Sequence, residues 1–439
     1  MFNYFNSYVL YPVLEKGLKR NILPKLNELR KWDRISPADK KEIISKKLNH
    51  ILKISQNEVP YYKELFKRKN FDPDLVLKDV KYLQDLPVLT KQIILEQGSR
   101  MFRSNNYTAL HPRKTGGSTG KSVVFYYDNE ALDWTAAAHL YAVELTGKKR
   151  IDTEIHLCGD INEEKMSLRN TLIDSIKLAS LNRSKLMVSG FSENNLNQYY
   201  QQLLNERPYL VQGHPSTMYA ISQFVKDKNL PVVKVCDVFE PSGEALNDKM
   251  VQSIQHYLGC KVYNRYGNAE LGVIAHSLKD DSYKRLKILD MLAYVESTSE
   301  KEILVTGLFN YSMPLIRYST GDLCTVVETP MGSYLEDIEG RVHDSVNIAG
   351  SSYPTHFIMD YLDHRVGGIV EFQILVNENE FPLLRIVPSS WDDINRIKEL
   401  VVKRWPEGLR LVFIKHEQLI QVGWRGKFRH VITNQESVK

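Results

Sequence analysis

The sequence predicts an α/β protein with a large multi-layer N-terminal domain and a small α+β C-terminal domain. From about residue 115, short β-rich runs alternate with helical patterns, the order typical of layered α/β domains. Helical patterns fill the preceding segment as an N-terminal preface. After Gly340-Arg341 the chain restarts as a compact unit of about a hundred residues. These observations place the domains at 1–340 and 341–439.

The preface is expected to form helices at 40–52 and 90–97, separated by turns at Pro60, Pro73 and Pro87. The large domain then alternates strands and helices, and its pattern changes to strand-turn-strand at 302–327, which favours an antiparallel or barrel-like subdomain. The expected strands are 123–127, 155–157, 209–212, 235–240 and 261–263, and the expected helices are 132–146, 196–205, 218–226 and 248–258.

The C-terminal unit is predicted to contain two strands, a helix and a further strand, followed by an exposed loop that leads into a short strand. The corresponding ranges are 369–376, 383–387, 392–404, 410–414 and 421–434.

Composition favours a soluble globular protein, because 43% of the 439 residues are hydrophobic and 25% are charged. The net charge of +5 is spread along the chain, so we expect no nucleic-acid-binding arm. The four cysteines form no Cys-x-x-Cys pair, which predicts neither a zinc framework nor a redox motif. Without a signal-peptide pattern or a long apolar stretch, we expect a cytoplasmic protein with no transmembrane segment.

A glycine-rich loop at 115–122 reads Thr-Gly-Gly-Ser-Thr-Gly-Lys-Ser, and its backbone amides, hydroxyls and lysine could hold phosphate oxygens. A Walker A loop would need glycine in place of Thr115, a strand before it and a helix after it. The strand expected at 123–127 follows the loop directly, which disfavours that interpretation. A surface turn remains an alternative, since clusters of Gly, Ser and Thr commonly form loops.

A second motif follows the expected strand at 261–263, at the strand end where α/β proteins usually bind ligands. Its aromatic ring, Tyr266, could stack on a base, and its carboxylate, Glu270, could hold Mg²⁺ near phosphates. Each residue taken alone has a structural alternative, a core tyrosine or a solvated charge at a helix start.

Several short motifs occur in order between about Pro87 and the C-terminus: 115–121, 242–244, 264–270, 317–323, 340–344 and 426–427. In this order they resemble the adenylate-forming acyl-CoA synthetase superfamily, and most closely its phenylacetate-CoA ligase-like branch, which is often found in capsular and surface polysaccharide biosynthesis. The resemblance implies the adenylate-forming fold with a mobile C-terminal lid domain. It also implies use of ATP, Mg²⁺ and CoA.

The resemblance assigns roles residue by residue. Glu270 would hold Mg²⁺, Tyr266 would stack on adenine, and Asp322 would bind the ribose hydroxyls. Arg341 would reach the nucleotide from the hinge, and Lys427 would promote adenylation. The remaining nucleotide-binding residues would be Thr115, Gly116, Gly117, Ser118, Thr119, Gly120, Lys121, Ser242, Gly243, Glu244, Asn264 and Gly267. Arg317 is either a nucleotide contact or a packing arginine.

Two positions depart from the family pattern. Ala269 stands where a hydroxyl residue usually precedes the metal-binding glutamate, and His343 stands at the usual hinge position. The sequence therefore leaves two alternatives to a ligase: a nucleotide-binding relative without catalysis, or a P-loop-like kinase that forms ADP. The substrate of a ligase would be a small carboxylic acid.

The acceptor and the assembly state are less constrained. CoA is the default acceptor, and an amine on a sugar or amino acid is the alternative. We expect the acyl pocket to draw on residues 156–159 and 212–218, which follow predicted strands. The aromatic residues between Phe2 and Tyr11 are expected to pack on the main domain, although dimer contacts or surface attachment would also fit them. A homodimer is therefore an option that the sequence leaves open.

Overall fold

The fold was analysed in a computed structural model of the chain. The structure describes residues 2–104, 109–114, 123–159, 168–188, 191–243, 246–279, 281–330, 332–339, 345–377, 380–415, 418–422, 427–428 and 430–433. Within these residues no helix is both long enough and apolar enough to cross a bilayer.

A five-stranded parallel sheet forms one layer, in the order β4-β3-β5-β6-β7. Helices alternate with its strands, as the sequence predicts, and α11 begins after an Asn247 cap and ends at the left-handed Gly259. The strands are β3 Glu154–Gly159, β4 Arg183–Val188, β5 Leu210–Gly213, β6 Val238–Pro241 and β7 Lys261–Val262, and the helices are α8 Leu168–Ser180, α9 Glu193–Glu206, α10 Pro215–Asp227 and α11 Asp248–Leu258.

A seven-stranded antiparallel sheet forms a second layer, in the order β11-β12-β13-β14-β10-β9-β8. It confirms the antiparallel pairing expected at 302–327 and extends it in both chain directions. The strands are β8 Arg265–Asn268, β9 Gly272–His276, β10 Arg285–Ile288, β11 Ala293–Ser297, β12 Glu302–Gly307, β13 Tyr318–Thr329 and β14 Gly332–Glu339.

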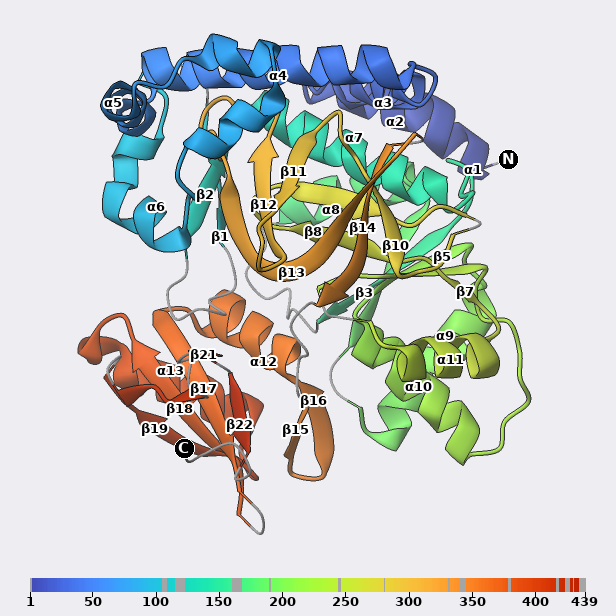
Figure 1. Cartoon of the computed structure of the whole chain (residues 1–439). Helices are drawn as coiled ribbons and strands as arrows, with labels where there is room; N and C mark the ends of the chain where they lie inside the picture. The colour runs from blue at the N-terminus through green and yellow to red at the C-terminus, as the bar shows by residue number, and fades with distance from the viewer. Residues whose placement is uncertain are drawn as a thin grey trace.

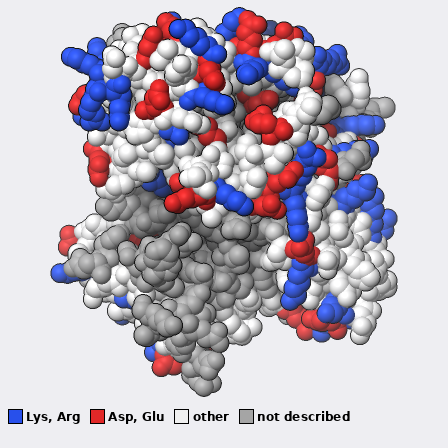
Figure 2. All heavy atoms as spheres, viewed as in Figure 1, with Lys and Arg blue, Asp and Glu red and all other residues white. Residues whose placement is uncertain are grey.

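The N-terminal preface is helical, as expected, and lies across the top of the molecule in Figure 1. Its longest helix starts at a Ser36 cap followed by Pro37, the pattern that favours a helix N-terminus. The helices are α1 Phe2–Phe5, η1 Asn6–Leu10, α2 Tyr11–Gly17, α3 Ile22–Trp32, α4 Pro37–Glu58, α5 Pro60–Lys69, η2 Pro73–Leu77, η3 Val80–Asp85, α6 Lys91–Gln97 and η4 Gly98–Met101; α7 Asn129–Leu145 packs against α3. Positive and negative side chains are interspersed over the upper part of the face in Figure 2.

The glycine-rich loop joins two antiparallel strands, β1 His111–Lys114 and β2 Val124–Tyr127. The loop residues 115–122 lie outside the described residues. A Walker A loop connects a strand to a helix. The β1-β2 hairpin therefore excludes the P-loop context and removes the structural basis for a P-loop-like kinase.

The C-terminal segment builds a four-stranded sheet, β19-β18-β17-β22, around its own hydrophobic cluster. In Figure 1 it lies below the rest of the molecule. The domain boundary stays a prediction, because residues 340–344 lie outside the described part. The elements are β15 Ser345–Ile348, β16 Ser351–Pro354, α12 Thr355–Tyr361, η5 Leu362–Val366, β17 Ile369–Val376, β18 Leu383–Pro388, η6 Trp391–Asp393, α13 Ile394–Arg404, β19 Arg410–Phe413, β20 Gln421–Val422, β21 Lys427–Phe428 and β22 Val431–Thr433.

Candidate active site

Tyr266 and Asp322, which are far apart in sequence, are in direct contact. The Tyr266 hydroxyl donates to Asp322 Oδ2 over 2.9 Å. Burial and the neighbouring Asp322 charge raise the pKa of Tyr266 well above its ordinary value, so the phenol keeps the proton that it donates. Gly267 lets β8 approach β9 closely, because a Cβ there would lie 2.3 Å from the carbonyl oxygen of Gly272. The two residues that the resemblance assigns to adenine and ribose thus lie together.

Glu270 lies in the turn between β8 and β9 and is buried. Asn268 Oδ1 accepts a hydrogen bond from the Leu271 amide over 2.9 Å and so holds this turn. Glu270 Oε1 accepts from the Tyr318 hydroxyl over 2.9 Å and lies 3.6 Å from Lys91 Nζ. A single carboxylate of this kind suits Mg²⁺, which usually takes one or two protein carboxylates and completes its shell with water and phosphate.

Lys91 is a site neighbour that the sequence analysis missed. Thr90 caps helix α6 through the amide of Ile93. Leu89 exchanges backbone hydrogen bonds with the start of β13, donating to the Arg317 carbonyl over 3.0 Å and accepting from the Ser319 amide over 2.9 Å. The sequence indicates the helix cap at Thr90, but it does not indicate the long-range pairing that brings Lys91 to Glu270.

Ser242 and Gly243 lie at the carboxyl end of β6, where α/β sheets bind ligands. The Ser242 amide donates to the carbonyl of Gly213, at the end of β5, over 2.9 Å. Gly243 has φ +80°, and a Cβ there would lie 2.7 Å from Cε1 of His214. The ends of β5 and β6 therefore pack together without room for a larger residue at Gly243.

Three other residues considered in the sequence analysis have structural contacts: Asn264, Arg317 and Met218. The Asn264 side chain accepts from the Arg265 amide over 2.9 Å and shapes the turn into β8. Arg317 contacts Glu296 over 3.2 Å and main-chain carbonyls of the preface, so it is the packing arginine that the sequence left as one option. Met218, in the segment expected to line the acyl pocket, is fully buried in the core of the parallel-sheet layer.

Lys427 forms β21, where its main chain pairs with Val422. The following lie outside the described residues: Thr115, Gly116, Gly117, Ser118, Thr119, Gly120, Lys121, Glu244, Arg341 and His343.

A buried polar network adjoins these elements and was not predicted. In the strand register Gln212 is the partner of His156 on one side and of Glu240 on the other, so the three side chains share one face of the sheet. Glu240 accepts from Gln212 and lies 2.9 Å from His276 Nε2 and 3.3 Å from Arg265. Burial alone would raise the pKa of Glu240, but Arg265 and His276 hold it far below its ordinary value.

His139 of α7 continues this network between two guanidinium groups. Its Nδ1 lies 3.1 Å from Arg265 and its Nε2 lies 3.2 Å from Arg183. Burial, together with these two positive charges, lowers the pKa of His139 to about 3. The imidazole is therefore neutral at physiological pH. Because Arg265 directly precedes Tyr266, the network holds the strand that carries the candidate adenine contact.

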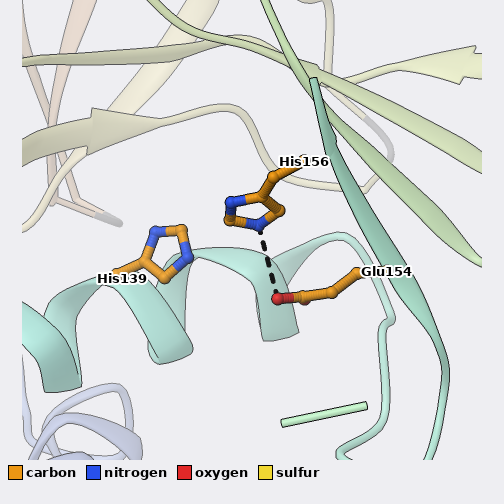
Figure 3. A group of neighbouring side chains, drawn as sticks. All are labelled: His139, Glu154 and His156. Carbon is orange, nitrogen blue, oxygen red and sulfur yellow. Dashed lines mark ion pairs between the residues drawn. The ribbon is translucent and has the colours of Figure 1, made fainter. Parts of the chain in front are cut away.

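The inner end of the network groups His139, Glu154 and His156, whose ligand atoms all lie within 4.8 Å of one another. Figure 3 shows His139 on its helix facing the two side chains of β3. The group has metal-ligand chemistry, but Arg183 binds both Glu154 and His139, and Lys148 lies 3.2 Å from Glu154. These cations already neutralise the carboxylate, and a metal ion would add a further positive charge beside them. The group therefore does not fit a metal ion.

Known proteins are similar to this chain over most of its length. No protein-family model matches the sequence. The chain is 25% identical over 370 residues to Protein CapK of Staphylococcus aureus, covering 80% of this chain and 78% of that protein. It is similar to 2-hydroxyisobutyryl-CoA ligase in complex with 2-HIB-AMP and CoA in the thioesterification state, with TM-score 0.58, 19% identity and coverage of 91% and 90% of the two chains. It is also similar to that ligase in the postadenylation state with R3-HIB-AMP, with TM-score 0.57, 17% identity and 91% coverage of each.

These similarities confirm the predicted α/β fold class and, at the level of the fold, the resemblance to adenylate-forming enzymes. The phenylacetate-CoA ligase-like branch and the roles of individual residues stay predictions.

Proposed function

Because the chain has the fold of adenylate-forming CoA ligases, we propose that it is an AMP-forming acid ligase. It activates a small carboxylic acid with ATP to an acyl-adenylate, releases pyrophosphate, and then transfers the acyl group to an acceptor with release of AMP. One observation carries the proposal: Tyr266, Asp322 and Glu270, which the family resemblance assigns to adenine, ribose and Mg²⁺, lie together in one sheet. Side-chain hydrogen bonds link Tyr266 and Glu270, from β8 and the turn after it, to β13.

The chemistry explains why such residues are needed. A carboxylate that attacks the α-phosphate of ATP meets an anion, so the transition state requires positive charge placed in advance. Mg²⁺, held by Glu270, would supply part of that charge. Lys91 adds a cation 3.6 Å from Glu270. In this proposal the ring of Tyr266, which is largely buried, stacks on the base, while its hydroxyl orients Asp322 for the ribose.

The remaining charge comes, in this proposal, from residues of the C-terminal segment. Lys427 approaches for adenylation and Arg341 reaches the nucleotide, while the glycine-rich loop receives pyrophosphate. A lysine on a small mobile domain can be present for the first step and withdrawn for the second. The domain division at residue 341 is part of this proposal.

For the acceptor we propose CoA, since 2-hydroxyisobutyryl-CoA ligase, which has the same fold, has been solved in complex with 2-HIB-AMP and CoA. An amine acceptor is the second candidate. Similarity to Protein CapK over 80% of the chain favours a place in capsular polysaccharide biosynthesis. The phenylacetate-CoA ligase-like branch is proposed from the sequence motifs alone.

A silent nucleotide-binding relative is the competing proposal, and Ala269 favours it because no hydroxyl precedes Glu270. The Tyr127 hydroxyl donates to the carbonyl of Ala269 over 2.9 Å and so holds the turn that carries Glu270. Retention of Glu270 and its neighbours favours a working enzyme.

The test is to incubate the protein with ATP, Mg²⁺ and a panel of aryl, fatty, amino and sugar acids, with and without CoA. We expect pyrophosphate that depends on one acid class, and AMP release that depends on the acceptor. Glu270→Gln should lose both, whereas Asp248→Asn, at an exposed carboxylate paired with Lys284, should retain them. Binding of ATP with no turnover across the panel would favour the silent relative.

A further inference from the structure

The first helical segment, residues 2–17, buries side chains with polar groups and leaves large apolar side chains exposed. The side chains that it buries are Ser7, Tyr11 and Glu15, which recur every four residues along one face. A surface helix ordinarily buries its apolar face and exposes its polar one. In this segment the most deeply buried side chains instead carry a hydroxyl or a carboxylate, while Leu10 and Leu14 are half-buried.

Hydrogen bonds hold this polar face in place. The Ser7 hydroxyl donates to the Arg150 carbonyl over 2.6 Å and accepts from Asn182 Nδ2 over 2.9 Å. The Asn6 side chain donates to Asn182 Oδ1 over 3.0 Å. Glu15 accepts from the amides that open α3 at Ile22 and Leu23. The orientation is therefore fixed by specific contacts from three other parts of the chain.

The opposite face is apolar and exposed. Phe2 is 85% exposed, Phe5 51% and Val13 65%, and with Val9 they recur at helical spacing on one side. Tyr4 and Tyr8 flank that side. Of the eighteen large hydrophobic residues exposed in the described part of the chain, seven fall within residues 2–18. Such a concentration indicates a surface that is covered by something apolar. We call these residues, Phe2, Phe5, Val9 and Val13, the apolar face.

The exposed charges within the segment itself have one sign. Between residues 2 and 20 the only acidic side chain is Glu15, which is buried and bound to backbone amides. The basic residues of this stretch include Lys16 and Lys19, both exposed. A second copy of the chain would bring like charges together at a symmetric contact. An anionic lipid surface would instead meet an apolar face with positive charge beside it, the pattern of interfacial helices.

We propose that the helical segment 2–17 docks this protein on an anionic membrane surface, with the apolar face entering the interface and Lys16 and Lys19 beside the lipid headgroups. The segment lies on the surface and does not span the bilayer. In Figure 1 it runs along the edge of the molecule remote from the C-terminal sheet, so docking leaves that sheet clear of the membrane.

The test is cosedimentation of the full chain with vesicles of phosphatidylcholine alone, or of equal parts phosphatidylcholine and phosphatidylglycerol. We expect binding to the anionic vesicles only. We expect at least about tenfold weaker binding of the triple variant Phe5→Ser, Val9→Ser, Val13→Ser. Two single variants, Lys16→Ala and Lys19→Ala, should each bind about fivefold more weakly. A matched variant with Val232→Ser, Phe381→Ser and Trp391→Ser, exposed elsewhere, should bind normally.

Three results would overturn the proposal: no binding to either vesicle, equal binding to both, or equal loss in the matched variant. Light scattering in the same buffers distinguishes the competing occupant, because a dimer that the triple variant dissociates would assign the apolar face to a second copy. Acid-dependent pyrophosphate release should be unchanged in all variants, so this test stands apart from that of the proposed ligase.

Discussion

Two buried carboxylate sites in this protein differ in how fully their charge is neutralised. Glu154 has three cationic or ionisable partners: Arg183, Lys148 at 3.2 Å and His156 at 3.4 Å. Glu270 contacts one hydroxyl and has Lys91 at 3.6 Å. A carboxylate with its charge already matched stabilises the fold, whereas one with less compensation can still attract a cation. The difference separates a structural network from a candidate magnesium site.

The largest effect is expected at Glu154. Glu154→Gln removes the negative charge and leaves Arg183 and Lys148 buried beside a neutral amide. We predict a loss of roughly 3–5 kcal/mol in the free energy of unfolding, measured by urea denaturation. Glu144→Gln, which breaks a more exposed pair with Arg30, should cost no more than about 1 kcal/mol. Equal effects of the two substitutions would show that the inner network is not a stabilising unit.

At Glu270 the loss should appear in activity instead of stability. Glu270→Gln keeps the hydrogen-bonding shape but removes the charge proposed to hold Mg²⁺. We predict roughly a 100- to 1,000-fold lower rate of acid-dependent pyrophosphate release, with a melting temperature close to that of the parent. A much lower melting temperature, together with an unchanged rate measured below it, would reverse the assignment of the two sites.

Acid should weaken the inner network specifically. His139 has a pKa of about 3 in the fold, whereas an unfolded histidine titrates near pH 6.5. Between these two pH values the unfolded chain therefore binds more protons than the folded one. The stability that the neutral His139 contributes is complete above about pH 6.5 and is lost as the pH falls. At pH 5 the expected loss is about 2 kcal/mol. His139→Gln should flatten the slope of unfolding free energy against pH, while His256→Gln, at an exposed site, should leave it unchanged.

The smallest effect is expected at the hydroxyl of Tyr266. Tyr266→Phe keeps the ring but removes the hydrogen bond to Asp322, which should cost about 1 kcal/mol, seen as a several-fold higher KM for ATP. Tyr266→Leu also removes the stacking surface and should raise KM further. Identical KM values for the two variants would argue against base stacking.

Local signals predicted much of the fold. The helix expected at 248–258 matches α11, because Asn247 and Gly259 mark both ends. The strand at 369–376 matches β17, an apolar run that only Glu371 and Gln373 interrupt. The helix expected at 40–52 is in fact α4, Pro37–Glu58, since Ser36-Pro37 starts it earlier than its apolar periodicity suggests. β4 was not predicted, because polar residues at Arg183, Ser184 and Lys185 obscure its pattern.

The site was predicted only where its residues share a short motif. Tyr266 and Glu270 lie within one motif, and Asp322 within another, so their order along the chain was informative. Lys91 and His139 reach their partners through strand pairing and helix packing, which local sequence does not encode. His139 is also distant in sequence from Glu154 and His156, so their grouping could not be predicted.

The central claim is that Glu270, with Tyr266 and Asp322, serves adenylation. The most direct measurement is acid-dependent exchange of labelled pyrophosphate into ATP, because it reports the first step without any acceptor. The account predicts exchange that requires one acid class and Mg²⁺, is nearly abolished by Glu270→Gln, and is retained by Glu154→Gln under conditions where that variant is folded. Formation of ADP, or exchange that survives in Glu270→Gln, would contradict it.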